Sequence, residues 1–219
     1  MCPKSVEILP GIARALATVN THLGFAPHLH TACPGTIRVA SRQSASTHML
    51  HRTLRAATRI DHAMVDRLMS RFDLSRREDY SLFLQVHYWA LKNLDTHWRD
   101  EDYTDFAAMI ACLHNDLRAL TGVTTERREL TNTAFLVAHH LGIAYVIRGS
   151  RLGAAFVRRR VAGQFPTSYL DFVPTLPWGR FLDQLELASD SKCFTTDDTI
   201  RGARMTFEMF AALLTPALA

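Results

Sequence analysis

The sequence predicts an all-α protein built as a single bundle of about six helices. Apolar residues recur with a period close to 3.6 residues from Leu50 almost to the end of the chain, as they do on the buried face of a helix. No stretch of alternating apolar and polar residues is long enough to predict a sheet. A chain of 219 residues, 47% hydrophobic and 21% charged, is large enough to form one domain with its own core.

Residues 1–48 are expected to form a poorly ordered extension to a helical domain of residues 49–219. The segment carries Pro3, Pro10, Pro27 and Pro34 and a polar run over residues 41–47. It has no sustained helical period apart from a short stretch over residues 9–19. Met49 follows it directly and is an alternative candidate for the first residue of the protein.

The first two helices of the domain are expected over residues 50–71 and 75–98. An apolar stripe marks the first helix and contains Leu54, Thr58, His62, Val65 and Met69. Ser75 is expected to open the second helix, where Glu78 three residues later completes a capping box. The third helix is expected over about 103–120, with Gly122 as its stop.

A long fourth helical element is expected over about residues 125–162. A proline-containing loop follows, and two more helices, around residues 181–185 and 203–214, close the chain. As one unbroken helix, the fourth element would have about 38 residues and a length of about 57 Å, too long for a compact domain of this size. A kink within it is therefore expected.

Three glycines interrupt this fourth element and fall on one helical face: Gly142, Gly149 and Gly153. A glycine inside a helix costs about 1 kcal/mol relative to alanine, so three on one stripe require a reason. Their spacing favours close packing against another helix. The alternative is that a flat ligand lies against bare backbone, where a side chain would collide with it.

His62 lies in the apolar stripe of the first helix. A histidine in such a place is more often a hydrogen-bonded core residue than a ligand. The functional interpretation is an axial ligand to haem iron, because a proximal imidazole on a helix is a common way to hold haem. His62 and the glycine stripe would then be two walls of a slot for a large planar cofactor.

Composition and motifs exclude several other classes. A net charge of +4 is too small to indicate a nucleic-acid partner, and four scattered cysteines indicate free thiols in a reducing compartment. No apolar run is long enough to span a membrane, and no secretory signal is recognisable, so a cytoplasmic location is expected. Metalloprotease, di-iron, hydrolase, P-loop and dinucleotide motifs are missing from the sequence.

Five arginines of the fourth element are expected to form a solvated face: Arg148, Arg151, Arg158, Arg159 and Arg160. The alternative interpretation is that they hold the propionates of a bound haem or dock an acidic protein.

Two motifs resemble those of the haem oxygenase family. The run Leu54-Arg-Ala-Ala-Thr-Arg-Ile-Asp-His62 is similar to the proximal motif of these enzymes. The run Gly149-Ser-Arg-Leu-Gly-Ala-Ala-Phe156 resembles the kinked distal helix of bacterial members. The resemblance covers about residues 50–215 and does not include residues 1–48. It implies an all-α, haem-oxygenase-like bundle that sandwiches haem between a proximal and a kinked distal helix.

The resemblance also implies roles for individual residues. His62 would be the axial ligand to the haem iron, Arg55 would bind a haem propionate, and Thr58 would belong to the same proximal wall. Gly149 and Gly153 would let the distal backbone approach the haem, with Ser150 beside the bound oxygen. Bacterial members usually have Glu immediately before the distal Gly-Ser, whereas this chain has Arg148.

The activity implied by the resemblance is oxidative cleavage of haem to biliverdin, carbon monoxide and ferrous iron. Haem would be both substrate and cofactor, with O₂ as co-substrate. Electrons would come from an external donor such as ferredoxin, flavodoxin or a reductase, and a phytochrome could receive the biliverdin. No nucleic-acid or membrane partner is expected. Two alternatives remain open: a non-catalytic haem-binding or haem-carrier protein on the same fold, and a helical interaction module without haem.

Overall fold

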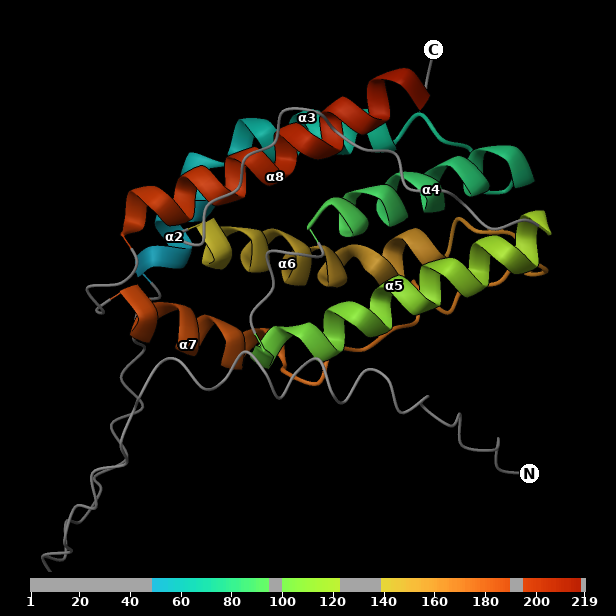
Figure 1. Ribbon diagram of the computed structural model, residues 1–219. Helices are drawn as coiled ribbons and strands as arrows, with labels where there is room; N and C mark the ends of the chain where they lie inside the picture. Colours follow the sequence, from blue (N-terminus) through green and yellow to red (C-terminus); the bar gives the residue numbers. More distant parts are fainter. Residues whose placement is uncertain (1–48, 95–99, 123–138, 190–194, 218–219) are drawn as a thin grey trace, which may run out of the picture. The chain divides into compact units, whose positions relative to one another are not determined.

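The computed structural model describes residues 49–94, 100–122, 139–189 and 195–217 (Figure 1). Within these ranges all seven elements are α-helices, which confirms the all-α prediction. The predicted extension of residues 1–48 lies outside the described residues, as do residues 123–138 at the start of the predicted fourth element. Among the described helices, none has both the length and the apolar character needed to cross a membrane.

The helix predicted over residues 50–71 is divided at Thr58 into α2 (Met49–Ala57) and α3 (Arg59–Met69). The hydroxyl of Thr58 donates a 2.8 Å hydrogen bond to the carbonyl of Leu54, which also accepts the Thr58 backbone N–H at 2.9 Å. Such bonding of a threonine hydroxyl to the preceding turn bends helices. Periodicity could not predict the break, because Thr58 is buried and fits the apolar stripe.

α4 (Arg77–Leu94) and α5 (Asp100–Thr121) form the next helical pair. The turn before α4 is organised by Asp73, whose carboxylate accepts hydrogen bonds from the backbone N–H and the hydroxyl of Ser75. Asp79 in turn accepts the backbone N–H of Asp73 at 2.8 Å, so Asp73 and Asp79 take the place of the predicted Ser75–Glu78 box. The predicted stop at Gly122 is confirmed by its φ of 75°, which favours glycine.

α6 (His140–Arg158), α7 (Trp178–Ser189) and α8 (Thr196–Ala217) complete the domain. α6 runs through the middle of the helical domain beside α8, with α5 and α7 on its other side (Figure 1). Gly142 lies directly on α8, where a Cβ atom would collide with the backbone of Thr199 and Ala203. For Gly142, the interpretation as close helix packing is therefore correct.

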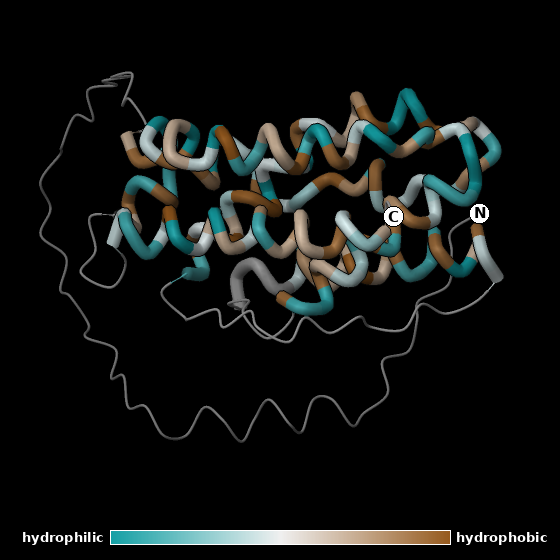
Figure 2. Tube along the Cα trace, turned by 90° about the horizontal axis from the view of Figure 1, so that it is seen from above, coloured by the Kyte–Doolittle hydropathy of each residue, from teal (hydrophilic) through white to brown (hydrophobic). Residues whose placement is uncertain are grey.

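The two halves of α6 differ in burial, and this difference positions the candidate site. Figure 2 shows hydrophobic and hydrophilic residues alternating along the helices, as expected for amphipathic helices around a core. Residues 142–148 are buried on every side of α6. Further along the same helix, the exposed fraction is 63% for Leu152 and 69% for Phe156. The C-terminal half of α6 thus presents an apolar face that the rest of the domain leaves uncovered.

Candidate functional site

The uncovered face of α6 is formed by Gly149, Leu152, Gly153 and Phe156, and we call it the open face. Spacings of three, four and seven residues place these positions on one side of the helix. A Cβ atom built on Gly153 would meet no atom within 4 Å, so backbone is directly accessible at this point. The face combines bare backbone with two exposed apolar side chains, which is the chemistry that suits a flat apolar ligand.

Gly149 differs from Gly153, although the sequence predicted the same role for both. A Cβ atom on Gly149 would lie 3.5 Å from the indole ring of Trp178, at the start of α7. A Cβ atom at Gly149 would therefore be in ordinary van der Waals contact with a neighbouring aromatic ring. Only Gly153 has the unobstructed surroundings that a bound ligand would need.

Three rings close one end of the open face, and we call them the aromatic triangle. They belong to His51 of α2, Tyr145 of α6 and Trp178 of α7. Their centroids are 5.9 Å apart for His51–Tyr145, 5.9 Å for His51–Trp178 and 5.7 Å for Tyr145–Trp178. Tyr145 lies one helical turn before Gly149, so the triangle covers the part of α6 where its residues become buried.

His62 is an exposed residue, so its interpretation as a core histidine is wrong. The exposed fraction of its side chain is 61%, and its Nδ1 lies 2.9 Å from a carboxylate oxygen of Asp66. The edge of its ring also packs against Phe207 of α8, at 5.6 Å between centroids. Because a carboxylate can only accept, the contact assigns the proton of neutral His62 to Nδ1 and leaves Nε2 with a free lone pair.

α2 contacts α6 at the aromatic triangle, where His51 packs against Tyr145. Arg55 follows His51 by four residues, so both lie on one side of α2. Burial raises the pKa of Tyr145, and the nearby charge of the exposed Arg55 partly offsets this rise.

The two hydroxyl groups in the predicted site are bonded to their own helices. Thr58 donates to Leu54, as described above, and Ser150 donates a 2.7 Å hydrogen bond to the carbonyl of Ile147. Thr58 is buried, whereas Ser150 is exposed beside the open face. Ser150 can therefore reach a ligand by exchanging one hydrogen bond for another, but Thr58 can offer only its methyl group.

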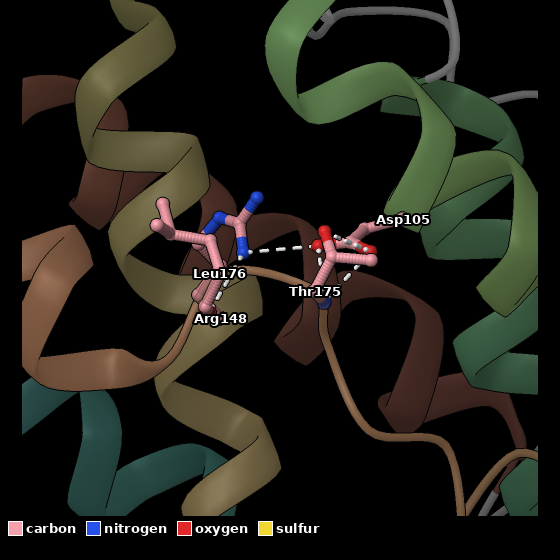
Figure 3. Close-up of polar contacts among 4 residues, drawn as sticks. All are labelled: Asp105, Arg148, Thr175 and Leu176. Atoms are coloured by element: carbon pink, nitrogen blue, oxygen red, sulfur yellow. Dashed lines mark hydrogen bonds and ion pairs between the residues drawn. The ribbon is translucent and has the colours of Figure 1, made fainter.

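The solvated arginine face predicted on α6 is wrong for Arg148, which is buried. Its guanidinium contacts the carboxylate of Asp105 on α5 at 3.2 Å, and both side chains are only 6% exposed (Figure 3). Asp105 also accepts the backbone N–H and the hydroxyl of Thr175, each at 3.0 Å, and Arg148 reaches the carbonyl of Leu176 at 3.5 Å. We call this group of four residues the Arg148 clip.

The neighbouring arginines also fasten the chain between α6 and α7. Arg151 donates to the carbonyl of Tyr169 at 2.9 Å and lies 4.2 Å from the centre of its ring. Arg160 donates to the carbonyl of Phe72 at 2.9 Å. Arg158 forms a 3.5 Å ion pair with Asp171. Helical periodicity could not predict these contacts, because their partners lie in a loop and in other elements.

His87, the next histidine on an apolar stripe, is a core residue. It is buried in α4, its Nδ1 lies 2.8 Å from the carbonyl of Phe83, and its ring packs against those of Tyr169 and Phe210. Burial lowers the pKa of His87 to about 4, so the ring is neutral at physiological pH. Neutral, enclosed and hydrogen-bonded, His87 has the environment that sequence reasoning assigned to His62.

Asp66 and Trp178 are the site residues that sequence reasoning missed. Asp66 could have been found, because a carboxylate four residues after a histidine on a helix is within reach of its ring. Trp178 gave no such signal, since it is brought to Gly149 by the fold. Within the described residues, no group of three or more His, Cys, Asp or Glu side chains gathers as a metal site.

A groove of about 250 Å³ lies elsewhere, between the start of α6 and α7. It is lined by His140, Leu141, Phe181, Gln184, Leu185, Leu187 and Ala188. None of the predicted haem-contacting residues lines it. The candidate site residues therefore lie on two separate exposed faces, His62 on α3 and Gly153 on α6. No model of a known protein family matches the chain, and no match is found among curated proteins.

Proposed function

We propose that the protein is a haem oxygenase that cleaves haem to biliverdin, carbon monoxide and ferrous iron. The observation that carries the proposal is the state of His62: exposed, oriented through Nδ1 by Asp66, and left with Nε2 for a metal ion. A histidine that binds a metal through one ring nitrogen commonly donates the other N–H to a carboxylate, which fixes the ring and raises its basicity.

Residues on α6 and α2 fit haem in three further respects. Gly153 leaves backbone accessible with nothing within 4 Å of its Cβ position, as a distal wall against a flat ring would require. Leu152 and Phe156 add exposed apolar surface on the same face, and burying such surface is favourable. Arg55 is exposed on α2 and could pair with a propionate. A kink in α6 at its glycines, as the resemblance implies, belongs to this proposal.

Each of these residues has a defined task in the proposed reaction. Haem supplies the iron at which O₂ is reduced and the porphyrin carbons that are oxidised. His62 would hold the iron through Nε2, and Asp66 would hold the proton on Nδ1, so that the imidazole stays oriented. Gly153 keeps the space beside the distal backbone free of side chain. Ser150 can offer its hydroxyl there, while Leu152 and Phe156 exclude bulk water.

The test of haem binding is the substitution His62→Ala. We expect this variant to lose the Soret spectrum of the wild-type complex, and added imidazole to restore part of it by filling the vacant axial position. His114→Ala is the matched control, because His114 lies on α5, where its ring faces Tyr88. An unchanged haem spectrum in His62→Ala would contradict the assignment of the ligand.

Asp66→Asn tests the orientation of the ligand separately. The amide oxygen can still accept the Nδ1 proton, but the charge that raises the basicity of the ring is lost. Removing such a partner lowers metal affinity by about 10- to 100-fold, and we expect haem affinity to fall by a similar factor. Glu208→Gln, an exposed carboxylate on α8, is the control. Equal affinities in the two variants would show that Asp66 has no part in haem binding.

A further inference from the structure

Trp178 marks the boundary between the covered and uncovered parts of the α6 face. On one side of its indole, Tyr145 is buried beneath Trp178 and His51. The outer edge of the same indole lies 3.5 Å from the Cβ position of Gly149. One turn further along α6, Gly153 has no neighbour within this range. A flat ligand lying on the open face and moving toward the start of α6 would therefore meet Trp178 first.

The Arg148 clip positions Trp178, because its member Leu176 lies only two residues upstream in the chain. Thr175 is bound to Asp105 through both its N–H and its hydroxyl, and Leu176 is bound through its carbonyl to Arg148 (Figure 3). The guanidinium of Arg148 also lies 5.6 Å from the ring centre of Phe181, one turn after Trp178 in α7. The clip thus ties the start of α7 to the same helix that carries the open face.

We propose that Trp178, positioned by the Arg148 clip, is an end stop that determines how far the planar substrate enters along α6. The inference rests on the proposed function and adds a determinant of substrate seating to it. Which edge of the ring lies nearest the bare backbone at Gly153 would depend on this stop. Trp178 is therefore assigned as a specificity-determining residue, and Arg148 as a positioning residue that acts through it.

The test compares haem-loaded wild-type protein with Trp178→Ala, Trp178→Phe and Arg148→Met. The hyperfine-shifted haem methyl resonances of the ferric cyanide complex report how the ring is seated, independently of turnover. Biliverdin isomers formed with ascorbate and O₂ give a second readout. Trp89→Ala is the matched control, because it removes a half-buried indole from α4. Arg77→Met is the control for Arg148, because Arg77 of α4 likewise donates to a backbone carbonyl, that of Leu120, and lies 5.6 Å from the ring centre of Phe165.

We expect Trp178→Ala to change the methyl shift pattern and the isomer ratio, with a smaller change in Trp178→Phe, which keeps an aromatic ring. Arg148→Met should change both readouts in the same direction with Trp178 present, while the two controls keep the wild-type pattern. Wild-type seating in a folded Trp178→Ala variant would overturn the end stop and leave the proposed function intact. A wild-type protein that forms no haem complex would overturn both.

Discussion

Two histidines on similar apolar stripes have opposite environments in this fold. His62 is exposed and paired with a carboxylate, whereas His87 is enclosed by aromatic rings and bonded to a backbone carbonyl. The sequence could predict that each lies on an apolar stripe, because both obey the helical period. It could not predict which stripe the neighbouring helices cover, because that depends on how α3 and α4 pack against the later helices.

The buried state of His87 predicts how stability changes with pH. Its pKa is about 4 in the folded protein, lowered by burial from an ordinary value of 6.5. Between about pH 4 and pH 6.5, the unfolded chain therefore binds a proton on His87 that the folded chain does not. The stability that neutral His87 contributes is fully present above about pH 6.5 and falls as the pH drops toward 4. A difference of this size corresponds to about 3 kcal/mol.

Urea unfolding between pH 4 and pH 7 measures this contribution. We expect His87→Leu to flatten the pH dependence, while His114→Leu keeps the wild-type slope. Equal slopes in wild type and His87→Leu would show that other groups are responsible for the loss of stability in acid.

At the scale of elements, the glycines of α6 differ in whether a partner helix covers them. Gly142 was predicted to pack against a helix and does so, because its face is pressed onto α8. Gly149 and Gly153 share its spacing, but α8 does not cover them. Spacing predicts that residues share a face, yet the length over which a partner helix covers that face is a property of the whole fold.

Alanine substitutions at Gly142 and Gly153 should therefore have opposite effects on stability. In Gly142→Ala the new methyl group would collide with the backbone of α8, and overpacking of this kind costs about 1–3 kcal/mol. In Gly153→Ala the methyl group meets nothing, so the helix should gain about 0.5–1 kcal/mol from the better helix former. Melting temperatures of the two variants measure both effects, and equal melting temperatures would contradict the packing described for α6.

The arginines of α6 show where prediction from helical elements ends. Their charge and spacing indicated a solvated face, but Arg148 and Arg151 bind groups from the loop between α6 and α7. Loop residues such as Thr175 have no periodic pattern, so nothing in the sequence places them beside α6. The buried pair of Arg148 and Asp105 is accordingly visible only in the folded molecule.

At the scale of the whole molecule, the domain of residues 49–219 is expected to carry the proposed activity without residues 1–48. The buried side chains described above lie in helices that begin at Met49, and the predicted extension offers no periodic apolar face. Removing residues 1–48 should therefore leave haem affinity and turnover nearly unchanged. Haem titration and thermal melting of the shortened protein test this, and failure to fold would place the domain boundary earlier in the chain.

In the proposed function, the faces that carry His62 and Gly153 together hold haem for its own oxidation. The most direct measurement is the absorbance of biliverdin after haem, ascorbate and O₂ are added to purified wild-type protein and to Gly153→Leu. We expect biliverdin formation by the wild type. The variant should retain His62-bound haem but lose most turnover, because the new side chain fills the space beside the distal backbone. A wild-type protein that binds haem without forming biliverdin would contradict the enzyme and favour a haem carrier. A Gly153→Leu variant that forms biliverdin at the wild-type rate would contradict the role of the open face.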